Sequence, residues 1–373
     1  MIFIIVIDMT HSPIRTIASL VAVAALALAG CSDSPGKTGG SQTTATADAN
    51  DGKEGNSNGG KAKRKEVSSL KPRLVVSYDG GLLTLDGATG KVLADVKKGG
   101  FLRLNPAGDG RHVVVSDGDV FRLFDVGLIA QRHEDHYHYY VASPRLTSAQ
   151  IKAPKAGHVV NHAGRTSLFS DGDGTVQTFA ADALKDGKLD PSEIKAFKGG
   201  DAHHGVAVPL SNGNMLTTKG TEKERHTIQE VDPSGKVVAE TTDCPGVHGE
   251  AAAQSNANGD VVSFGCTNGP VVYRDGAFHK IPVSEPYQRS GNQFGSPESP
   301  YVLADYKTVK PAEGAEGVTE RPTSAGVIDT ASGTLKKVDL GSPYWFRSFA
   351  RGPNGEGLVL TYDGNLAILD PAS

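Results

Sequence analysis

One pattern occurs three times in the sequence: HAGRTSLFSDGDG (residues 162–174), HGVAVPLSNGN (204–214) and HGEAAAQSNANGD (248–260). Each copy starts with a histidine, continues through small and β-branched residues, and reaches a turn rich in Gly, Asn and Asp. The starting histidines are 42 and 44 residues apart. Repeats of about 40–50 residues with four strands each are typical of β-propeller blades. The pattern therefore predicts an all-β protein built from blades.

The same alternation of strands and turns extends from Arg73 to the end of the chain. Short β-branched runs are separated by DG, NG and PSG turns, which is the signature of antiparallel hairpins. Two further copies of the pattern, FLRLNPAGDG and WFRSFARGPNGEG, carry Arg103 and Arg347 where the other copies carry histidine. We predict a seven-bladed β-propeller over residues 73–373.

Closure of the ring is expected near the two ends of this region. The strands GLVLTYDG and NLAILD, at residues 357–370, are predicted to share a blade, or make a closing contact, with the strands near 74–96. Such closure removes exposed sheet edges. A β-sandwich is the alternative fold, but it does not explain the regular spacing of the histidines.

The N-terminal segment resembles a bacterial lipoprotein signal. A short positive start at His11 and Arg15 precedes an apolar stretch, and the small residues LAGC end it at Cys31. The apolar stretch is short for a membrane-spanning helix and fits a cleaved signal peptide better. We predict that translation starts at Met9, that the chain is cleaved before Cys31, and that a lipid is attached to the Cys31 sulfur.

Three regions follow from this interpretation: a signal peptide (1–30), a lipidated flexible linker (31–72) and the propeller (73–373). The linker is rich in Gly, Ser, Thr, Asn, Asp and Lys. It is too polar to bury the surface that would offset the entropy of ordering it. The mature protein is therefore expected outside the cytoplasm, anchored to the cell membrane.

Composition excludes several classes of function. The chain has 373 residues, with 38 Lys and Arg against 42 Asp and Glu, so its net charge is −4. Nucleic-acid-binding domains usually carry a basic surplus, so no nucleic-acid partner is expected. No Walker A, GxSxG or dinucleotide-binding fingerprint occurs in the sequence.

The repeated histidines are candidate metal ligands. In a propeller the first strand of each blade lines the central channel, so His162, His204 and His248 are expected to converge at one mouth. Three imidazoles on separate rigid strands suit Zn²⁺ and leave a fourth position open. His158 and His203 are expected nearby, where they could orient these ligands or supply the fourth, and Glu250 could help to orient them. The alternative is that the three are separate channel histidines without a metal.

The densest cluster of potential ligands is RHEDHYHYY at residues 132–140. It contributes His133, Asp135, His136 and His138 as candidate zinc ligands, because zinc accepts imidazole and carboxylate. His136 and His138 are two apart, so they share one face of a strand. We expect this segment to be a mobile arm. A solvated polar loop is the alternative, and the spacing does not match the HExxH motif of metalloproteases.

Cys244 and Cys266 remain once Cys31 carries a lipid. An even pair in an exported domain predicts a disulfide. Cys244 precedes the His248 strand and Cys266 ends the next strand, so both are expected on the face that holds the histidines. A zinc site of two cysteines with His248 is the alternative.

The assembled features resemble the AztD-type zinc metallochaperones over roughly residues 73–373. The motifs that carry the resemblance are HEDHYH (133–138), DAHHGV (201–206) and CPGVHGE (244–250). The resemblance implies a propeller that holds zinc outside the cytoplasm and hands it to the solute-binding protein of a zinc ABC importer. The lipid anchor departs from a freely diffusing chaperone and suggests a cell-surface version.

We therefore expect a zinc-binding metallochaperone without enzymatic activity. Two other functions stay open: a metal-dependent propeller hydrolase or lactonase, and a metal-free scaffold that binds a ligand or mediates adhesion. Recurrent histidine at the channel favours zinc binding over the hydrolase, whose channel would carry acids and amides.

Overall fold

The computed structural model describes residues 4–7, 63–312 and 320–373. Cys31, the rest of the predicted signal peptide beyond Ile4–Ile7, and the linker up to residue 62 lie outside the described residues. The described helices are two single 3₁₀ turns, and neither has the length or apolar character to cross a membrane.

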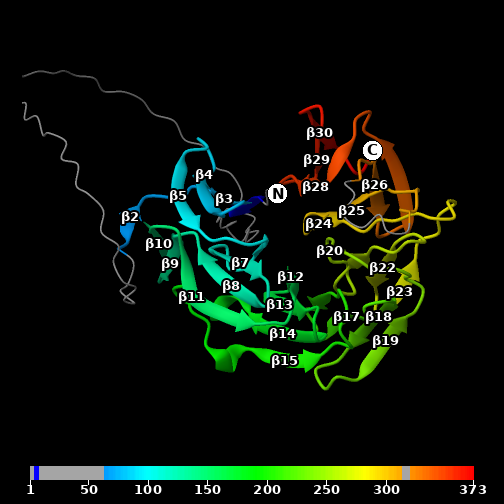
Figure 1. Ribbon diagram of the computed structural model, residues 1–373, viewed down its shortest axis with the longest axis horizontal. Coiled ribbons are helices and arrows are strands. Elements are labelled where there is room, and N and C mark those ends of the chain that lie inside the picture. Colours follow the sequence, from blue (N-terminus) through cyan, green and yellow to red (C-terminus); the bar gives the residue numbers. More distant parts are fainter. Residues whose placement is uncertain (1–3, 8–62, 313–319) are drawn as a thin grey trace, which may run out of the picture. The chain divides into compact units, whose positions relative to one another are not determined.

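The described chain is otherwise all-β, as predicted, and its sheets follow one another in sequence order (Figure 1). The first two large sheets pair β1 (Ile4–Ile7), β3 (Arg73–Tyr78), β4 (Gly81–Asp86) and β5 (Val92–Lys97), and then β6 (Leu102–Pro106), β7 (His112–Asp117), β8 (Val120–Asp125) and β11 (Arg145–Lys152). The next two contain β12 (Ala156–His162), β13 (Arg165–Ser170), β14 (Thr175–Ala180) and β15 (Lys195–Lys198), and then β16 (Ala207–Pro209), β17 (Met215–Gly220), β18 (Arg225–Val231) and β19 (Val237–Thr241).

Three more sheets complete the order. They contain β20 (Glu250–Ala252), β21 (Val262–Phe264), β22 (Val271–Arg274) and β23 (Ala277–Lys280); β24 (Gln293–Ser296), β25 (Ser299–Asp305), β26 (Ser324–Asp329) and β27 (Thr334–Asp339); and β28 (Tyr344–Arg351), β29 (Gly357–Thr361) and β30 (Leu366–Leu369). A small eighth sheet consists of a hairpin inserted between β8 and β11, formed by β9 (Leu128–His133) and β10 (His136–Val141), with β2 (Lys65–Val67) paired to β10. The seven large sheets are antiparallel meanders like propeller blades, which confirms the predicted fold class.

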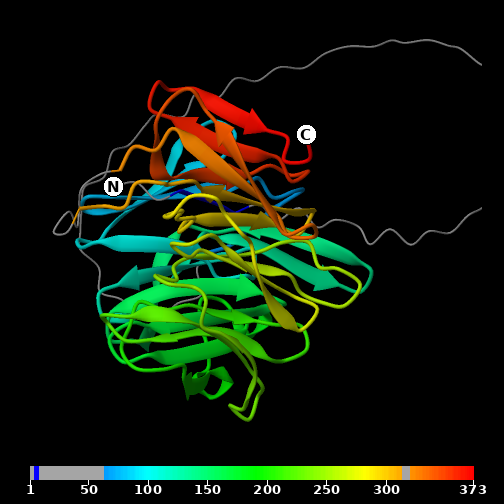
Figure 2. The ribbon, with the colours of Figure 1, turned by 90° about the vertical axis from the view of Figure 1, so that its right-hand side faces the viewer.

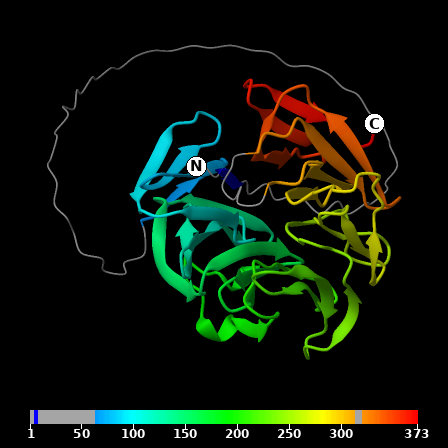
Figure 3. The same cartoon turned by 45° about the vertical axis from the view of Figure 1, so that its right-hand side comes forward.

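Apolar side chains from neighbouring sheets pack together and hold the ring. One cluster joins Phe121 of β8 to Leu168 of β13 and Phe179 of β14, and all three are almost completely buried. Each such side chain stabilises the fold by roughly 1.5–3 kcal/mol relative to exposure. In Figure 3 the sheets again succeed one another in the order of the sequence, from cyan through green to red, and Figure 2 shows the same sheets from the side.

The two ends of the propeller differ from the prediction. Among the described strands, β28, β29 and β30 form a sheet of their own, so the predicted shared blade with residues 74–96 is not observed. The first sheet instead takes β1, whose Ile4–Ile7 pair with β3 although they lie in the predicted signal peptide. Within the predicted linker, β2 pairs with β10.

Candidate metal centre

Three histidines from three consecutive sheets converge. His158 lies on β12, His204 lies in the loop before β16, and His248 lies in the loop before β20. Their potential ligand atoms all lie within 4.8 Å of one another, and the Nε2 atoms of His158 and His204 are 3.1 Å apart. We call these three residues the channel triad.

The Nδ1 atom of each triad histidine faces an acceptor. His204 Nδ1 lies 2.5 Å from Asp171 Oδ2, and His248 Nδ1 lies 2.7 Å from the carbonyl oxygen of Gly291. His158 Nδ1 lies 3.5 Å from Glu250 Oε2. Because a carboxylate and a carbonyl accept the Nδ1 protons of His204 and His248, Nε2 of these two residues keeps its lone pair and their ring orientation is fixed. This is how proteins commonly prepare histidines to ligate a metal.

Burial favours the neutral imidazoles that bind metals. Desolvation lowers the pKa of both His158 and His248 well below the usual value, and neighbouring imidazoles lower each further. Both side chains are therefore neutral at pH 7, and no proton has to leave them when a cation arrives.

The donor set fits zinc. Two nitrogens at about 2.0–2.1 Å from a tetrahedral Zn²⁺ are roughly 3.3 Å apart, close to the distance that already separates His158 and His204. Three imidazoles leave a fourth position open for water, an anion or a residue of another protein.

The triad differs from the predicted set at one residue. His162 does not join His204 and His248, and His158, which was expected to orient these ligands or to supply a fourth, takes its place. The reason is a tight turn: Ala163 (φ 48°) and Gly164 (φ 70°) have left-handed backbone, so His162 ends β12 and does not begin a strand. His158 is four residues earlier, roughly 13 Å along the strand.

His162 has its own contacts away from the triad. Its Nδ1 lies 2.7 Å from the carbonyl oxygen of Pro209, and its Nε2 lies 3.7 Å from Asp260. His162 and Glu250 both line a cavity of about 820 Å³ along the inner strands. Glu250 thus borders both this cavity and the channel triad.

His203, a predicted supporting residue, is next to His204 in the chain, but its ring nitrogens contact other groups. Its two ring nitrogens contact the carbonyl oxygen of Asp201 at 2.7 Å and Thr218 Oγ1 at 3.0 Å. Its ring packs edge-on against Phe169. His203 therefore helps to shape the loop that carries His204.

Glu250 lies behind His158 at the start of β20. Burial raises its pKa to about 8, and Arg103 and His204 oppose this shift. Its Oε2 atom is buried and has no hydrogen-bond partner among the residues that the structure describes. A carboxyl group in this position is neutral at pH 7 until a nearby positive charge favours its ionised form.

A disulfide joins Cys244 to Cys266, as predicted, and both residues are completely buried. The backbone N–H of His248 donates to the carbonyl oxygen of Gly265, and that of Thr267 donates to Pro245. The bond therefore ties the loop carrying His248 to the end of β21. Because both sulfurs are bonded to each other, the alternative zinc site with two thiolates is not formed.

The second cluster lies at the tip of the hairpin formed by β9 and β10. His133 and His136 are directly opposite each other across a two-residue turn, and His138 is two residues further on the same face. The ligand atoms of the three again lie within 4.8 Å of one another, with 3.1 Å between the Nε2 atoms of His136 and His138. This cluster, which we call the hairpin triad, is much more exposed than the channel triad.

Two carboxylates accompany the hairpin triad. Glu66 of β2 lies 2.9 Å from His138 Nδ1, and Asp135 lies 3.2 Å from His136 Nδ1. The Asp135 side chain is 95% exposed and lies outside the compact group of imidazoles. The sequence does not predict Glu66 at this site, because a lone Glu in a basic polar segment carries no signal of the pairing of β2 with β10.

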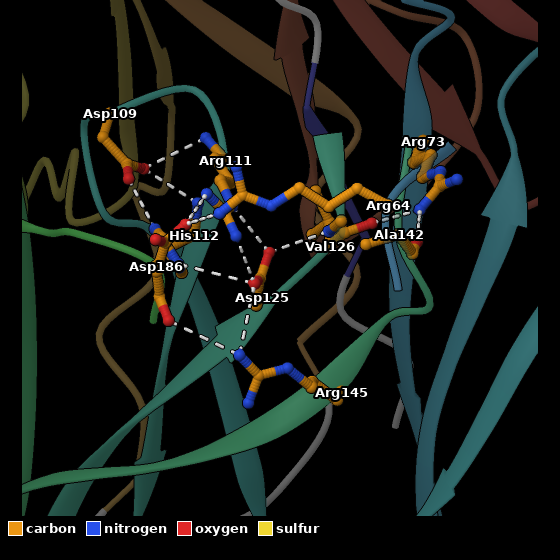
Figure 4. A network of polar contacts seen from close by, with 11 residues as sticks. Arg64, Arg73, Asp109, Arg111, His112, Asp125, Val126, Ala142, Arg145 and Asp186 are labelled. Atoms are coloured by element: carbon orange, nitrogen blue, oxygen red, sulfur yellow. Dashed lines mark hydrogen bonds and ion pairs between the residues drawn. The ribbon is translucent and has the colours of Figure 1, made fainter. Parts of the chain in front are cut away.

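The base of the hairpin is fixed to the first two large sheets (Figure 4). Arg73 Nη1 donates to the carbonyl oxygens of Val126 and Ala142, which flank the hairpin on either side. Arg111 binds Asp125 at 2.9 Å and 2.7 Å, and Asp125 also accepts from the Gly127 backbone at 2.9 Å. Any motion of the hairpin therefore involves its tip more than its base.

The two triads lie at opposite ends of the sheets. In each meander, the loop before the first strand and the turn between the second and third strands are at one end. Asp171, in the turn between β13 and β14, binds His204 at that end. The hairpin instead follows the last residue of β8, Asp125, in the third strand of its sheet. Asp125 pairs with His112, the first residue of β7, so the hairpin begins at the other end of the sheet. The two triads therefore cannot share one ion.

The chain is similar to known proteins in sequence and in fold. No protein-family model matches the chain. A match of 26% identity over 190 residues relates it to Zinc chaperone AztD of Citrobacter koseri. The aligned part spans 50% of this chain and 43% of that protein.

Solved structures share the fold. The crystal structure of Citrobacter koseri AztD superposes with a TM-score of 0.64 at 21% identity, covering 79% of this chain and 76% of the other. Its apo structure gives 0.62 at 20% identity, covering 79% and 77%. A chain of the Mitotic Checkpoint Complex gives 0.52 at 14% identity, covering 80% and 86%. Together the sequence match and the shared fold establish homology to Zinc chaperone AztD, which confirms the resemblance seen in the motifs.

Proposed function

We propose that this protein captures zinc outside the cytoplasm and transfers it to the solute-binding protein of a zinc ABC importer. The observation that carries the proposal is the channel triad, whose imidazoles present a compact set of nitrogens to one point while acceptors face each Nδ1. Homology to a protein named as a zinc chaperone supports zinc as the cargo.

The two triads suit different tasks. The channel triad is buried and its histidines are held by backbone and carboxylate contacts, which favours tight, selective binding. The hairpin triad is exposed at the tip of a projecting hairpin, which favours rapid capture and exchange. We assign storage to the channel triad and exchange with solvent or a partner to the hairpin triad.

The proposed location follows from the sequence and from the disulfide. Structural disulfides persist mainly in oxidising compartments, which fits an exported domain. A lipid on Cys31 would hold the domain at the cell membrane, where an importer's solute-binding protein also works. Metabolic labelling with a lipid precursor, compared between the parent and Cys31→Ala, tests the anchor.

The test of the main proposal is metal analysis of the folded domain after dialysis, followed by transfer to a zinc-free solute-binding protein. We expect about one tightly held zinc per chain and a second, more weakly held one. A dialysed protein without zinc that also fails to take it up would refute the proposal. Hydrolysis of lactones or esters by the same preparation would favour the enzymatic alternative.

A further inference from the structure

Two further sheets carry an arginine on their first strand. Arg103 is the second residue of β6, and Arg347 lies within β28, each the first strand of its sheet. Five of the seven large sheets thus carry a triad histidine or one of these arginines on, or just before, their first strand. The three histidines come from consecutive sheets, and the two arginines flank them from the remaining side.

Backbone contacts place Arg103 next to the channel triad. Arg103 pairs with Ser116 of β7, and Ser116 Oγ donates to the carbonyl oxygen of Gly157 at 3.3 Å. Gly157 directly precedes His158 in the chain. The Nε atom of Arg103 is buried and has no hydrogen-bond partner among the described residues. A buried guanidinium N–H without an acceptor costs free energy unless a ligand supplies one.

Arg347 reaches the same region through an irregular strand. The pairing of β28 with β29 is interrupted between Tyr344 and Phe349, and Arg347 lies within this bulge. Bulges re-aim side chains and are over-represented beside functional sites. The charge of Arg347 is close enough to Arg103 that the two oppose each other, and both also lower the pKa of His158.

The acids nearby are engaged by the histidines. Asp171 binds His204 at 2.5 Å, and Glu250 lies 3.5 Å from His158. The positive charges of Arg103 and Arg347 both act on His158 of the channel triad, and Arg103 also interacts with Glu250 and Asp171. Paired N–H groups of arginine match the two oxygens of a carboxylate or a bicarbonate.

We propose that Arg103 and Arg347 form an anion-binding site, and that the oxyanion they hold occupies the open fourth position of the metal on the channel triad. The inference rests on the proposed function, because it assigns the remaining ligand of the same zinc. The anion is a carboxylate or a carboxylate-like oxyanion, either free in solution or presented by a side chain of the acceptor protein. Binding or release of this anion would change the affinity of the channel triad for its metal.

The test uses the folded protein loaded with one equivalent of Co²⁺, whose visible absorption reports the ligands of the metal. Acetate and bicarbonate are titrated at constant ionic strength. We expect a saturable change in the spectrum, and we expect Arg103→Met and Arg347→Met each to weaken anion binding by at least tenfold. The matched control is Arg122→Met, which removes a positive charge from β8 that pairs with Asp117 away from the triad; it should bind anions like the parent.

The outcomes distinguish a free anion from one presented by a partner, and they distinguish failure of the anion site from failure of the zinc proposal. If acetate or bicarbonate changes the Co²⁺ spectrum at low millimolar concentration, the ligand is a free anion. If the spectral change needs much higher concentrations but is still lost in Arg103→Met, the ligand is a carboxylate presented by a partner protein. A spectrum that ignores both anions, or a response that the arginine variants share with the parent, overturns the anion site and leaves the zinc proposal intact. A parent that binds no Co²⁺ or Zn²⁺ at the triad overturns both.

Discussion

Oδ2 of Asp171 lies 2.5 Å from Nδ1 of His204, although the two residues belong to neighbouring sheets and are separated by 33 positions in the chain. Asp171 lies in the turn between β13 and β14, and His204 lies in the loop that enters β16. The contact fixes the tautomer of His204 and points its Nε2 at the other two imidazoles. It makes the geometry of the metal position depend on a residue that would never ligate the metal itself.

The first prediction concerns this contact. Asp171→Asn should weaken zinc binding by about 10–100-fold, because the imidazole loses its charged acceptor and part of its basicity. Competition with a chromophoric chelator measures the change. Asp119→Asn, at the corresponding turn of the preceding sheet, is the control and should bind zinc like the parent. Equal affinities for parent and Asp171→Asn would show that the contact plays no part in binding.

The second prediction separates two histidines of one strand. His158→Ala should lower zinc affinity on the order of 100-fold or more, because two imidazoles cannot complete a tetrahedral site without recruiting other ligands. His162→Ala should leave the affinity unchanged, since His162 contacts Pro209 and Asp260 instead. Circular dichroism and thermal unfolding of both variants control for folding. A loss of binding in His162→Ala alone would restore the set of ligands expected from the repeat.

The third prediction concerns pH. The pKa of Glu250 is raised to about 8, mainly by burial, so the metal-free protein holds this carboxyl protonated at pH 7. A dication on the channel triad favours the carboxylate, so zinc binding at pH 7 should release about one more proton from the parent than from Glu250→Gln. Zinc affinity of the parent should accordingly rise as the pH rises from 6 toward 8, and more steeply than in the variant.

Calorimetry in two buffers of different ionisation enthalpy counts these protons. His158 and His248 do not confuse the count, because burial lowers the pKa of both and they are neutral at pH 7. Proton release that is the same in parent and Glu250→Gln would show that Glu250 does not respond to the metal.

Local pattern predicted much of the fold but only part of the site. Alternating strands and turns at a regular spacing are properties of neighbouring residues, so the blades and the hairpin triad could be predicted from them. The repeat pattern predicts His162, and not His158, as the zinc ligand. It does so because a histidine that ends a strand and one that begins a strand can both precede a Gly-containing turn. Only the left-handed backbone at Ala163 and Gly164 distinguishes the two cases.

Contacts between sheets carried no local signal. The acceptors at His204 and His248 are Asp171 and the carbonyl oxygen of Gly291, which belong to turns of neighbouring sheets. Any acid or carbonyl in a turn would look the same in the sequence. Pairing of the N-terminal strand β1 with β3 was likewise hidden, because a start of translation at Met9 leaves Ile4–Ile7 outside the predicted protein.

The fourth prediction concerns the hairpin triad. The double variant His136→Ala and His138→Ala should lose the weaker zinc equivalent and keep the tight one, because the two triads lie at opposite ends of the sheets. It should also slow transfer to the acceptor protein. The single variant Glu66→Gln should weaken the same equivalent only slightly, since Glu66 contacts His138 and is itself largely exposed. A double variant that loses its tight zinc would contradict the assignment of the two roles.

The fifth prediction concerns the disulfide. Cys244 and Cys266 are 22 positions apart, and closing a loop of this size stabilises a protein by roughly 3 kcal/mol in the chain-entropy model. Replacing both with Ala should lower the free energy of unfolding by about that amount, measured by denaturant titration. It should also weaken zinc binding, because the loop before His248 is tied to the end of β21 through the bond and through the His248–Gly265 hydrogen bond. Saturating zinc should recover part of the lost stability, since the metal binds the folded state. If stability falls while zinc affinity is unchanged, the disulfide supports the blade but does not position His248.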